Sequence, residues 1–370
     1  MSTSSLPDFP WDTIAAESAL ARAHPDGLVD LSVGTPVDEV APAVQAALTS
    51  VAAQPGYPWT AGTPELRTAA VDALRRRHGV EGLSADAVLP TIGSKELVAW
   101  LPTLLGVGSG SSTDVVVIPD LAYPTYEVGG LLAGATVVRA GAAAVLPAGT
   151  RLVWLNSPSN PTGRVSPAAE LRSAIDAARA VGAVVAADEC YLSLYWHDED
   201  RPVSVLDPAV HGGRLDGLLA VHSLSKSSSL AGYRAGFVAG DPELVRRLLA
   251  VRKHAGMIVP RPVQAAMTAA LGDDEHVAEQ RSRYATRRTA LLAAVRAAGF
   301  TVEHSSAGLY LWITRDEPCR RTLAWFAERG ILVAPGDFYG PTGDRHVRLA
   351  LTATDRDIAT AVGRLTPPRE

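Results

Sequence analysis

The feature that most constrains this chain is a regular alternation, between residues 90 and 255, of short apolar runs with segments of helical periodicity. The β-rich runs lie at 114–118, 136–139, 151–155, 183–188, 218–222 and 236–239. Helical periodicity occurs at 40–53, 64–78, 94–105, 167–181 and 241–254. Apolar strands that alternate with helices are typical of a parallel sheet covered on both faces. We therefore predict an α/β fold with a mostly parallel central sheet and helices on both faces.

The pattern changes after about residue 257. Helical segments at 263–271, 276–298 and 318–329 flank separate strand candidates at 301–303, 309–313, 331–334 and 346–351. This arrangement predicts a smaller α+β domain over 257–370, after a large domain over 41–256. We expect the irregular segment 1–40 to pack on the small domain.

Composition narrows the class of protein. Of the 370 residues, 47% are hydrophobic, which allows a substantial core, and the net charge is -5. The acidic balance argues against nucleic acid or an anionic membrane as the main partner. No apolar run approaches the roughly 20 residues that span a bilayer, and the start of the chain lacks a signal-peptide pattern. Cys190 and Cys319 form no CxxC motif, so we expect a reducing, cytoplasmic setting.

Lysine is scarce here. The chain has only Lys95, Lys226 and Lys253 against 31 arginines, and a lysine amine can act as a nucleophile where a guanidinium cannot. Lys226 lies in SLSKSSSLAGYRAG, directly after a predicted strand, where small hydroxyl residues leave room for a bulky partner. An imine between lysine and an aldehyde is the resting state of enzymes that use pyridoxal 5'-phosphate (PLP). The alternative is a capping or solvent-exposed lysine, and Lys95 is the rival for the same role.

Polar residues gather where the predicted strands end. In open α/β sheets the ligand crevice lies beyond the carboxyl ends of the strands. We therefore expect one cleft to be lined by Tyr123, Asn160, Asp188, Tyr191, Ser223 and Lys226.

Three of these residues suit the cofactor ring. Asp188 ends the run AVVAAD, and a carboxylate at such a place needs a cation, which the pyridinium of PLP would supply. The amide of Asn160 and the hydroxyl of Tyr191 could donate to the phenolate oxygen of the ring. The alternatives are a helix cap or turn for Asp188, turn chemistry for Asn160 and core packing for Tyr191.

Two elements suit the phosphate. The segment GSKE, at 93–96, opens a helix after VLPTI, and free amides at a helix start bind anions. Arg234 offers a bidentate clamp, and Ser223 and Ser225 add hydroxyls. The glycine-rich stretch 106–112 precedes a predicted strand, which is the wrong order for a dinucleotide or P-loop motif, so we predict a turn there.

Together these motifs resemble the class I/II aminotransferases of PLP fold type I, from about Leu31 to the C-terminus. The strongest matches are SNPTG (159–163), the DE-C-Y run (188–191), SLSKSSSLAGYRAG (223–236) and HVRLAL (346–351). More narrowly, segments such as LSVGTPVD, SPSNPTG and AERGILVAPGDFYGP are similar to the actinobacterial N-succinyldiaminopimelate aminotransferases of lysine biosynthesis.

The resemblance implies a role for each matching residue. Lys226 would form the Schiff base and move the proton, Asp188 would pair with the pyridine nitrogen, and Tyr123 would stack on the ring. Asn160 and Tyr191 would hold the phenolate oxygen, and the phosphate would be surrounded by Gly93, Ser94, Lys95, Ser223, Ser225 and Arg234. Arg348 would grip the substrate α-carboxylate beside Gly34 and Asn160. Tyr57 matches a tyrosine that reaches the phosphate of the neighbouring subunit, which implies a homodimer with shared sites acting on small amino and oxo acids.

Other functions remain open. Another fold-type-I PLP enzyme, such as an aspartate or aromatic aminotransferase or a C–S β-lyase, would share the cofactor contacts. A PLP-sensing transcription regulator would carry a separate DNA-binding domain, whereas fewer than 60 residues precede Tyr57. A nicotinamide-dependent oxidoreductase is disfavoured because no strand–GxGxxG–helix order occurs.

Overall fold

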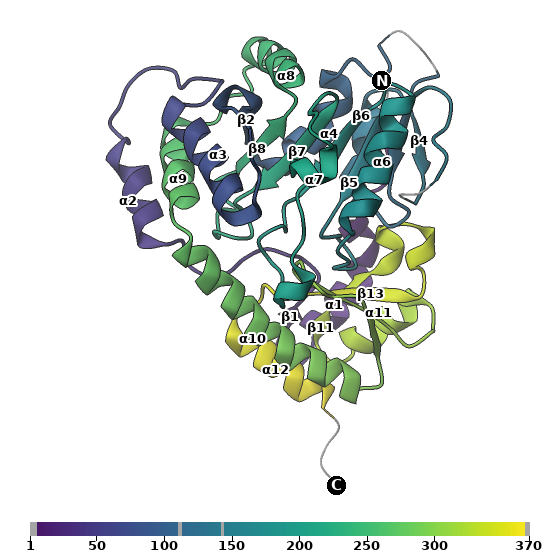
Figure 1. Cartoon of the computed structure of the whole chain (residues 1–370). Coiled ribbons are helices and arrows are strands. Elements are labelled where there is room, and N and C mark those ends of the chain that lie inside the picture. The colour runs from purple at the N-terminus through teal and green to yellow at the C-terminus, as the bar shows by residue number, and fades with distance from the viewer. Residues whose placement is uncertain (1–5, 110–112, 142–143, 367–370) are drawn as a thin grey trace.

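The computed structural model describes residues 6–109, 113–141 and 144–366, and its main feature is a seven-stranded sheet (Figure 1). The strand order is β2-β8-β7-β6-β5-β3-β4. The bounds are β2 (Val88–Ile92), β3 (Val115–Ile118), β4 (Thr136–Arg139), β5 (Thr150–Asn156), β6 (Val184–Asp188), β7 (Leu218–Ser223) and β8 (Ala235–Gly240). The neighbours from β4 to β7 pair in parallel, whereas β8 runs antiparallel to both β7 and β2. The prediction of a mostly parallel sheet is confirmed.

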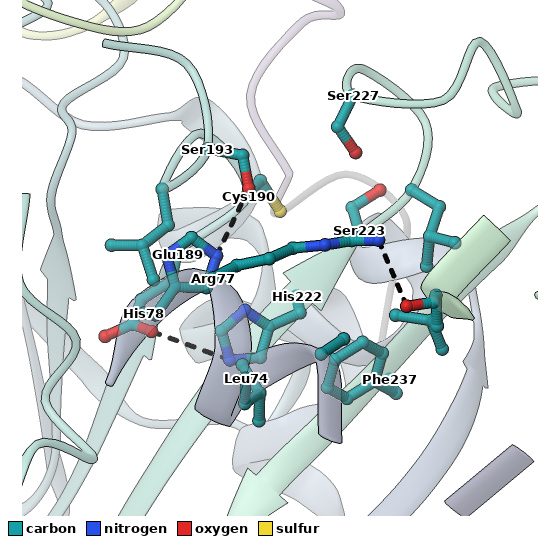
Figure 2. Close-up of a pocket in the computed structure, with 14 residues that line it drawn as sticks. Leu74, Arg77, His78, Glu189, Cys190, Ser193, His222, Ser223, Ser227 and Phe237 are labelled. Carbon is teal, nitrogen blue, oxygen red and sulfur yellow. Dashed lines mark hydrogen bonds and ion pairs between the residues drawn. The ribbon is translucent and has the colours of Figure 1, made fainter. Parts of the chain in front are cut away.

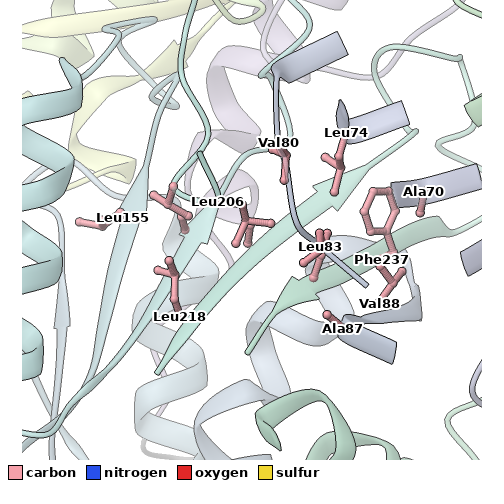
Figure 3. Packing of buried hydrophobic residues seen from close by; sticks show 14 of the residues in the cluster. Ala70, Leu74, Val80, Leu83, Ala87, Val88, Leu155, Leu206, Leu218 and Phe237 are labelled. Carbon is pink, nitrogen blue, oxygen red and sulfur yellow. The ribbon is translucent and has the colours of Figure 1, made fainter. Parts of the chain in front are cut away.

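Alternate residues of the strands point to opposite faces, and each face has its own apolar cluster. Val185, Ala187, Leu218, Ala220 and Phe237 lie on the first face, which α3 (Pro64–His78), α6 (Ala168–Ala180) and α9 (Arg261–Gly272) cover. Figure 3 shows part of this cluster, including Leu218 and Phe237. Ala186, Leu219, Val221 and Val238 lie on the second face, which α4 (Gly93–Leu104), α5 (Pro124–Leu132) and α8 (Pro242–Ala255) cover. This period of two decides which polar residue faces which way where each strand ends.

The helices follow the predicted periodicity, with additional ones that it did not indicate. Those over the main sheet are α2 (Pro42–Ser50), α3 (Pro64–His78), α4 (Gly93–Leu104), α5 (Pro124–Leu132), α6 (Ala168–Ala180), α7 (Pro208–His211), α8 (Pro242–Ala255) and α9 (Arg261–Gly272). The others are α1 (Ala15–Arg22), α10 (Glu275–Ala297), α11 (Cys319–Ala327) and α12 (Asp355–Leu365). Within the described ranges, no helix is both long and apolar enough to cross a membrane. The predicted glycine turn is seen over 106–109, and 110–112 lie outside the described residues.

A third apolar cluster belongs to a smaller sheet of order β12-β13-β10-β9. Its strands are β9 (Thr301–Glu303), β10 (Tyr310–Thr314), β12 (Ala334–Pro335) and β13 (His346–Ala350), and β1 (Val29–Asp30) pairs in parallel with β11 (Ile331–Leu332) beside it. The first part of the chain packs here, with the rings of Trp11 and Phe338 5.3 Å apart. In Figure 1, α10 runs from the main sheet down to this region. Residues 259–271 still pack in the cluster of the main sheet, and the boundaries expected at 40/41 and 256/257 stay predictions.

Candidate active site

Asp188 and Ser223 end the neighbouring strands β6 and β7, where Asp188 pairs with Val221. By alternation Asp188 falls on the same face as Ala186, and Ser223 on the same face as Val221. The residues directly beside them in the sequence, Glu189 and His222, fall on the opposite face. The sheet therefore aims one pair of polar residues into the predicted cleft and another pair away from it.

Lys226 lies just beyond β7, in the predicted position. Its Nζ donates a hydrogen bond to the carbonyl oxygen of Gly34, and its own carbonyl accepts one from the hydroxyl of Tyr284 at 3.2 Å. Burial lowers the pKa of the Lys226 ammonium. A lower pKa increases the fraction of neutral amine, which is the form that attacks an aldehyde.

Asp188 is a buried carboxylate with two donors. The hydroxyl of Tyr126 donates to its Oδ2 at 2.7 Å, and the backbone N–H of Cys190 donates to its Oδ1 at 3.2 Å. Burial raises the pKa of Asp188, although these hydrogen bonds oppose the shift. Among the residues that the structure describes, no lysine, arginine or histidine forms an ion pair with this carboxylate. It is thus matched to a cation supplied by a ligand, such as a protonated ring nitrogen.

Arg348 is the complementary case, a buried cation. Its Nη1 donates to Asn160 Oδ1 at 2.8 Å and its Nη2 to the carbonyl of Ser32 at 2.6 Å. Its Nε has no hydrogen-bond partner within the described part of the chain, and its only partners there are neutral. A buried guanidinium without an anion is costly, so Arg348 suits a ligand carboxylate. The bond to Arg348 also occupies the amide oxygen of Asn160 and leaves its NH2 group as a donor.

The phosphate side is built where α4 begins. Gly93 has φ +69°, and a Cβ on it would lie 2.3 Å from Nη2 of Arg234. Within the described residues, the N-cap residue Ile92 provides no side-chain cap for α4, and amides at such a helix start can bind an anion. The N–H of Ser225 donates to Ser223 Oγ at 3.1 Å, which brings two hydroxyl residues together at the end of β7. The donor set therefore fits a phosphate.

Lys95, which was expected at the phosphate, has an exposed side chain whose Nζ lies 5.7 Å from the ring centre of Phe9. Tyr57 is 91% exposed and lies on the surface, where its carbonyl accepts from Arg261 at 3.3 Å. A single chain does not bring Tyr57 to the other residues.

The aromatic residues line the remaining walls. Tyr123 precedes α5, its ring is 5.8 Å from that of Tyr126, and burial raises its pKa to about 12. Tyr191 is buried, and its hydroxyl lies 3.1 Å from the hydroxyl of Tyr310. No motif in the sequence singled out Tyr126 or Tyr310 as a site residue. Tyr126 could have been found because it lies one helical turn after Tyr123.

Behind this site, on the first face of the sheet, lies a buried polar group (Figure 2). Glu189 accepts from Ser204 Oγ at 2.7 Å and from the N–H of Val205 at 2.6 Å, and lies 3.5 Å from His222 Nε2. His78 lies 3.2 Å from the hydroxyl of Ser193, and both residues, together with Glu189 and His222, line a cavity of about 40 Å³. Burial raises the pKa of Glu189 to about 8 and lowers those of His78 and His222 to about 3.

The site combines a lysine whose pKa is lowered, an anion cradle, and a buried carboxylate and guanidinium that have no ion-pair partner among the described residues. These features agree with a family match. The family described as aminotransferase class I and II matches residues 26–365. The chain belongs to this family. It is a PLP-dependent aminotransferase of fold type I, as the sequence predicted, and the residues present fit that cofactor.

Relatives and solved structures give the same family. The chain is 64% identical, over 98% of its length and 86% of the other protein, to the probable aminotransferase Rv1178 of Mycobacterium tuberculosis. It is 55% identical, over 98% of its length and 99% of the other, to the 4-dedimethylamino-4-oxo-anhydrotetracycline transaminase OxyQ of Streptomyces rimosus. A Neisseria meningitidis aminotransferase structure matches with TM-score 0.88 at 31% identity, covering 99% of this chain and 98% of that one.

Proposed function

We propose that Lys226 is the residue on which this aminotransferase binds its cofactor and moves the substrate proton. The observation that carries this proposal is the pairing of a half-buried amine, whose pKa is lowered, with two buried charges of opposite sign, Asp188 and Arg348, which have no ion-pair partner among the described residues. PLP supplies the electron sink when bound. A neutral amine at Lys226 is able to accept the proton that leaves the substrate carbon.

The other residues hold the two ligands. Asp188 keeps the ring nitrogen protonated, Asn160 and Tyr191 donate to the phenolate oxygen, and Tyr123 covers the ring. Gly93, Ser94 and Lys95 offer the amides at the start of α4 to the phosphate, and Ser223, Ser225 and Arg234 offer their side chains. Arg348 binds the α-carboxylate of both the amino donor and the oxo acid, beside Gly34 and Asn160.

For the amino donor we propose N-succinyl-L,L-2,6-diaminopimelate, with 2-oxoglutarate as acceptor and lysine biosynthesis in the cytoplasm as the setting. The support is the sequence resemblance described above. The 55% identity to OxyQ favours a second candidate, transfer of an amino group to a polycyclic ketone.

A panel of donors with 2-oxoglutarate, monitored for glutamate, tests the substrate. Succinyldiaminopimelate should give the highest kcat/KM, ahead of acetylornithine, aspartate and aromatic amino acids. An aspartate or aromatic donor that wins by tenfold, about 1.4 kcal/mol of transition-state preference, would overturn the substrate while leaving the aminotransferase intact. Release of ammonia and pyruvate from a cysteine conjugate would indicate a β-lyase.

We further propose a homodimer in which Tyr57 completes the phosphate site of the partner subunit. The support is its 91% exposure, together with the family motif in which it lies. Inactive Tyr57→Ala and inactive Lys226→Ala proteins, mixed and allowed to exchange subunits, should regain activity, because one site of each hybrid has both residues. No recovery after verified exchange would contradict shared sites.

A further inference from the structure

Tyr310 connects three parts of the candidate active site. It is the first residue of β10 and only 4% exposed. Its ring lies under the guanidinium of Arg348, with Cζ 3.9 Å from the ring centre, and its hydroxyl is 3.1 Å from that of Tyr191. A residue that touches both a carboxylate clamp and a cofactor donor can influence each of them.

The position of the Tyr310 hydroxyl is fixed by a glycine. A Cβ on Gly34 would lie 2.4 Å from the Tyr310 oxygen, so the hydroxyl occupies the space that any larger residue would fill. The carbonyl of Gly34 also accepts from Lys226 Nζ. The phenol is therefore held between Gly34 and Tyr191, close to the lysine.

The number of phenol protons determines which tyrosine donates in the hydrogen bond between Tyr191 and Tyr310. Each phenol has one proton, and either oxygen could be the donor in the bond seen here. If Tyr191 gives its proton to the phenolate oxygen of the cofactor, the proton between the tyrosines must come from Tyr310. A hydroxyl that accepts a hydrogen bond becomes a stronger donor.

We propose that Tyr310 is a positioning residue that acts on the cofactor through Tyr191, and that its ring separately supports Arg348. This inference rests on the proposed cofactor site. Tyr310→Phe removes the hydroxyl but keeps the ring on Arg348, whereas Tyr310→Leu removes both. The two functions can therefore be separated by substitution.

The readout for the hydroxyl is the pH midpoint of the visible absorption band of the holoenzyme. When the lysine nitrogen is protonated, its positive charge already offsets the negative charge of the phenolate oxygen. A hydrogen-bond donor to that oxygen therefore stabilises the form with an unprotonated lysine nitrogen more strongly. A weaker donor raises the midpoint. We expect a rise of about half a pH unit for Tyr310→Phe and about one unit or more for Tyr191→Phe, since a polarising neighbour changes only part of a hydrogen bond.

A double-mutant cycle tests whether the effect passes through Tyr191. In the Tyr191→Phe background, Tyr310→Phe should cause no further shift. Tyr339→Phe is the matched control: its ring lies 5.0 Å from the same Arg348 Cζ, and its hydroxyl has no hydrogen-bond partner among the described residues. This control should leave the midpoint unchanged.

The KM for 2-oxoglutarate tests the ring. The KM should stay within about twofold of the wild type in Tyr310→Phe, which keeps the ring. It should rise about tenfold in Tyr310→Leu, because losing a cation–π contact at a desolvated site weakens binding by about tenfold or more. An unshifted band in Tyr310→Phe, or additive shifts in the double variant, would overturn the role of the hydroxyl. A wild-type protein without a lysine-linked band would instead contradict the proposed cofactor site itself.

Discussion

The hydroxyl of Tyr126 lies 2.7 Å from Asp188 Oδ2, and the Tyr126 ring stacks on Trp154 at 4.8 Å. The stack fixes the ring, so the hydroxyl is held as a donor to a carboxylate that burial would otherwise tend to protonate. The ionisation of Asp188 depends on this phenol.

Replacing Tyr126 by Phe should weaken PLP binding, and more so at low pH. Loss of the donor raises the pKa of Asp188 further, so a smaller fraction of the carboxylate is ionised to meet the ring nitrogen. A hydrogen bond to a charged group is worth about 1.5–3 kcal/mol, which corresponds to about tenfold or more in Kd. Titrating the apoenzyme with PLP between about pH 6 and pH 8 checks this. A Kd equal to that of the wild type across the range would contradict it.

Asp188→Ala should have a larger effect. Breaking a buried charge pair typically costs about 3–5 kcal/mol, or several hundred-fold or more in the affected step. PLP affinity and the single-turnover rate of proton removal from the amino donor measure that cost. Near-normal values of both would exclude Asp188 as the partner of the ring nitrogen.

The two glycines at α3 and α4 form a matched pair for testing the phosphate cradle. Gly79 and Gly93 share φ +69°, but a Cβ on Gly79 meets nothing within 4 Å, whereas one on Gly93 meets Arg234 at 2.3 Å. Each Ala substitution should cost about 1 kcal/mol of stability through backbone strain. Only Gly93→Ala should also weaken PLP binding, by about tenfold or more. Equal PLP affinities in the two variants would show that phosphate binding by the Arg234 guanidinium does not require the space left by the missing Cβ of Gly93.

The buried group behind the site should make stability depend on pH in two directions. His78 and His222 have pKa values lowered from 6.5 to about 3. Their contribution to the free energy of unfolding is therefore present above pH 6.5 and is lost as pH falls toward 3. Glu189 has a pKa raised from 4.5 to about 8, so its contribution is present below pH 4.5 and is lost as pH rises through 8.

Glu189→Gln separates these effects because an amide mimics the protonated carboxyl. It can still accept from Val205 and donate toward His222, yet it does not ionise. Denaturant unfolding of wild type and variant, from about pH 5 to pH 9, should show the alkaline loss only in the wild type. Parallel pH profiles would mean that Glu189 is already ionised in the folded protein.

The strand and helix periods predicted most of the main sheet and the gathering of residues at its edge. They did not indicate α5, which contains Gly129 and Gly130, two poor helix formers. Packing explains the helix, because a Cβ on Gly129 would lie 2.8 Å from the Val98 carbonyl of α4. Tyr126 was missed together with this helix.

Two other features required tertiary structure. The edge strand β2 contains Pro90, which obscures the strand pattern in the sequence but is tolerated at an edge. The contact between Tyr310 and Tyr191 joins residues 119 positions apart, and no local pattern encodes it. The side chains that carry charge follow from their motifs, whereas the contact that places the Tyr310 phenol beside Arg348 does not.

The most direct test of whether Lys226 holds the cofactor is to locate the covalent bond between them. The purified holoenzyme is reduced with borohydride, digested, and the modified peptide is sequenced by mass spectrometry. The cofactor should be found on Lys226, and Lys226→Arg should lose both the label and transamination, because a guanidinium cannot exchange imines. A label on Lys95 or Lys253, or a Lys226→Arg protein that still transaminates, would contradict the account.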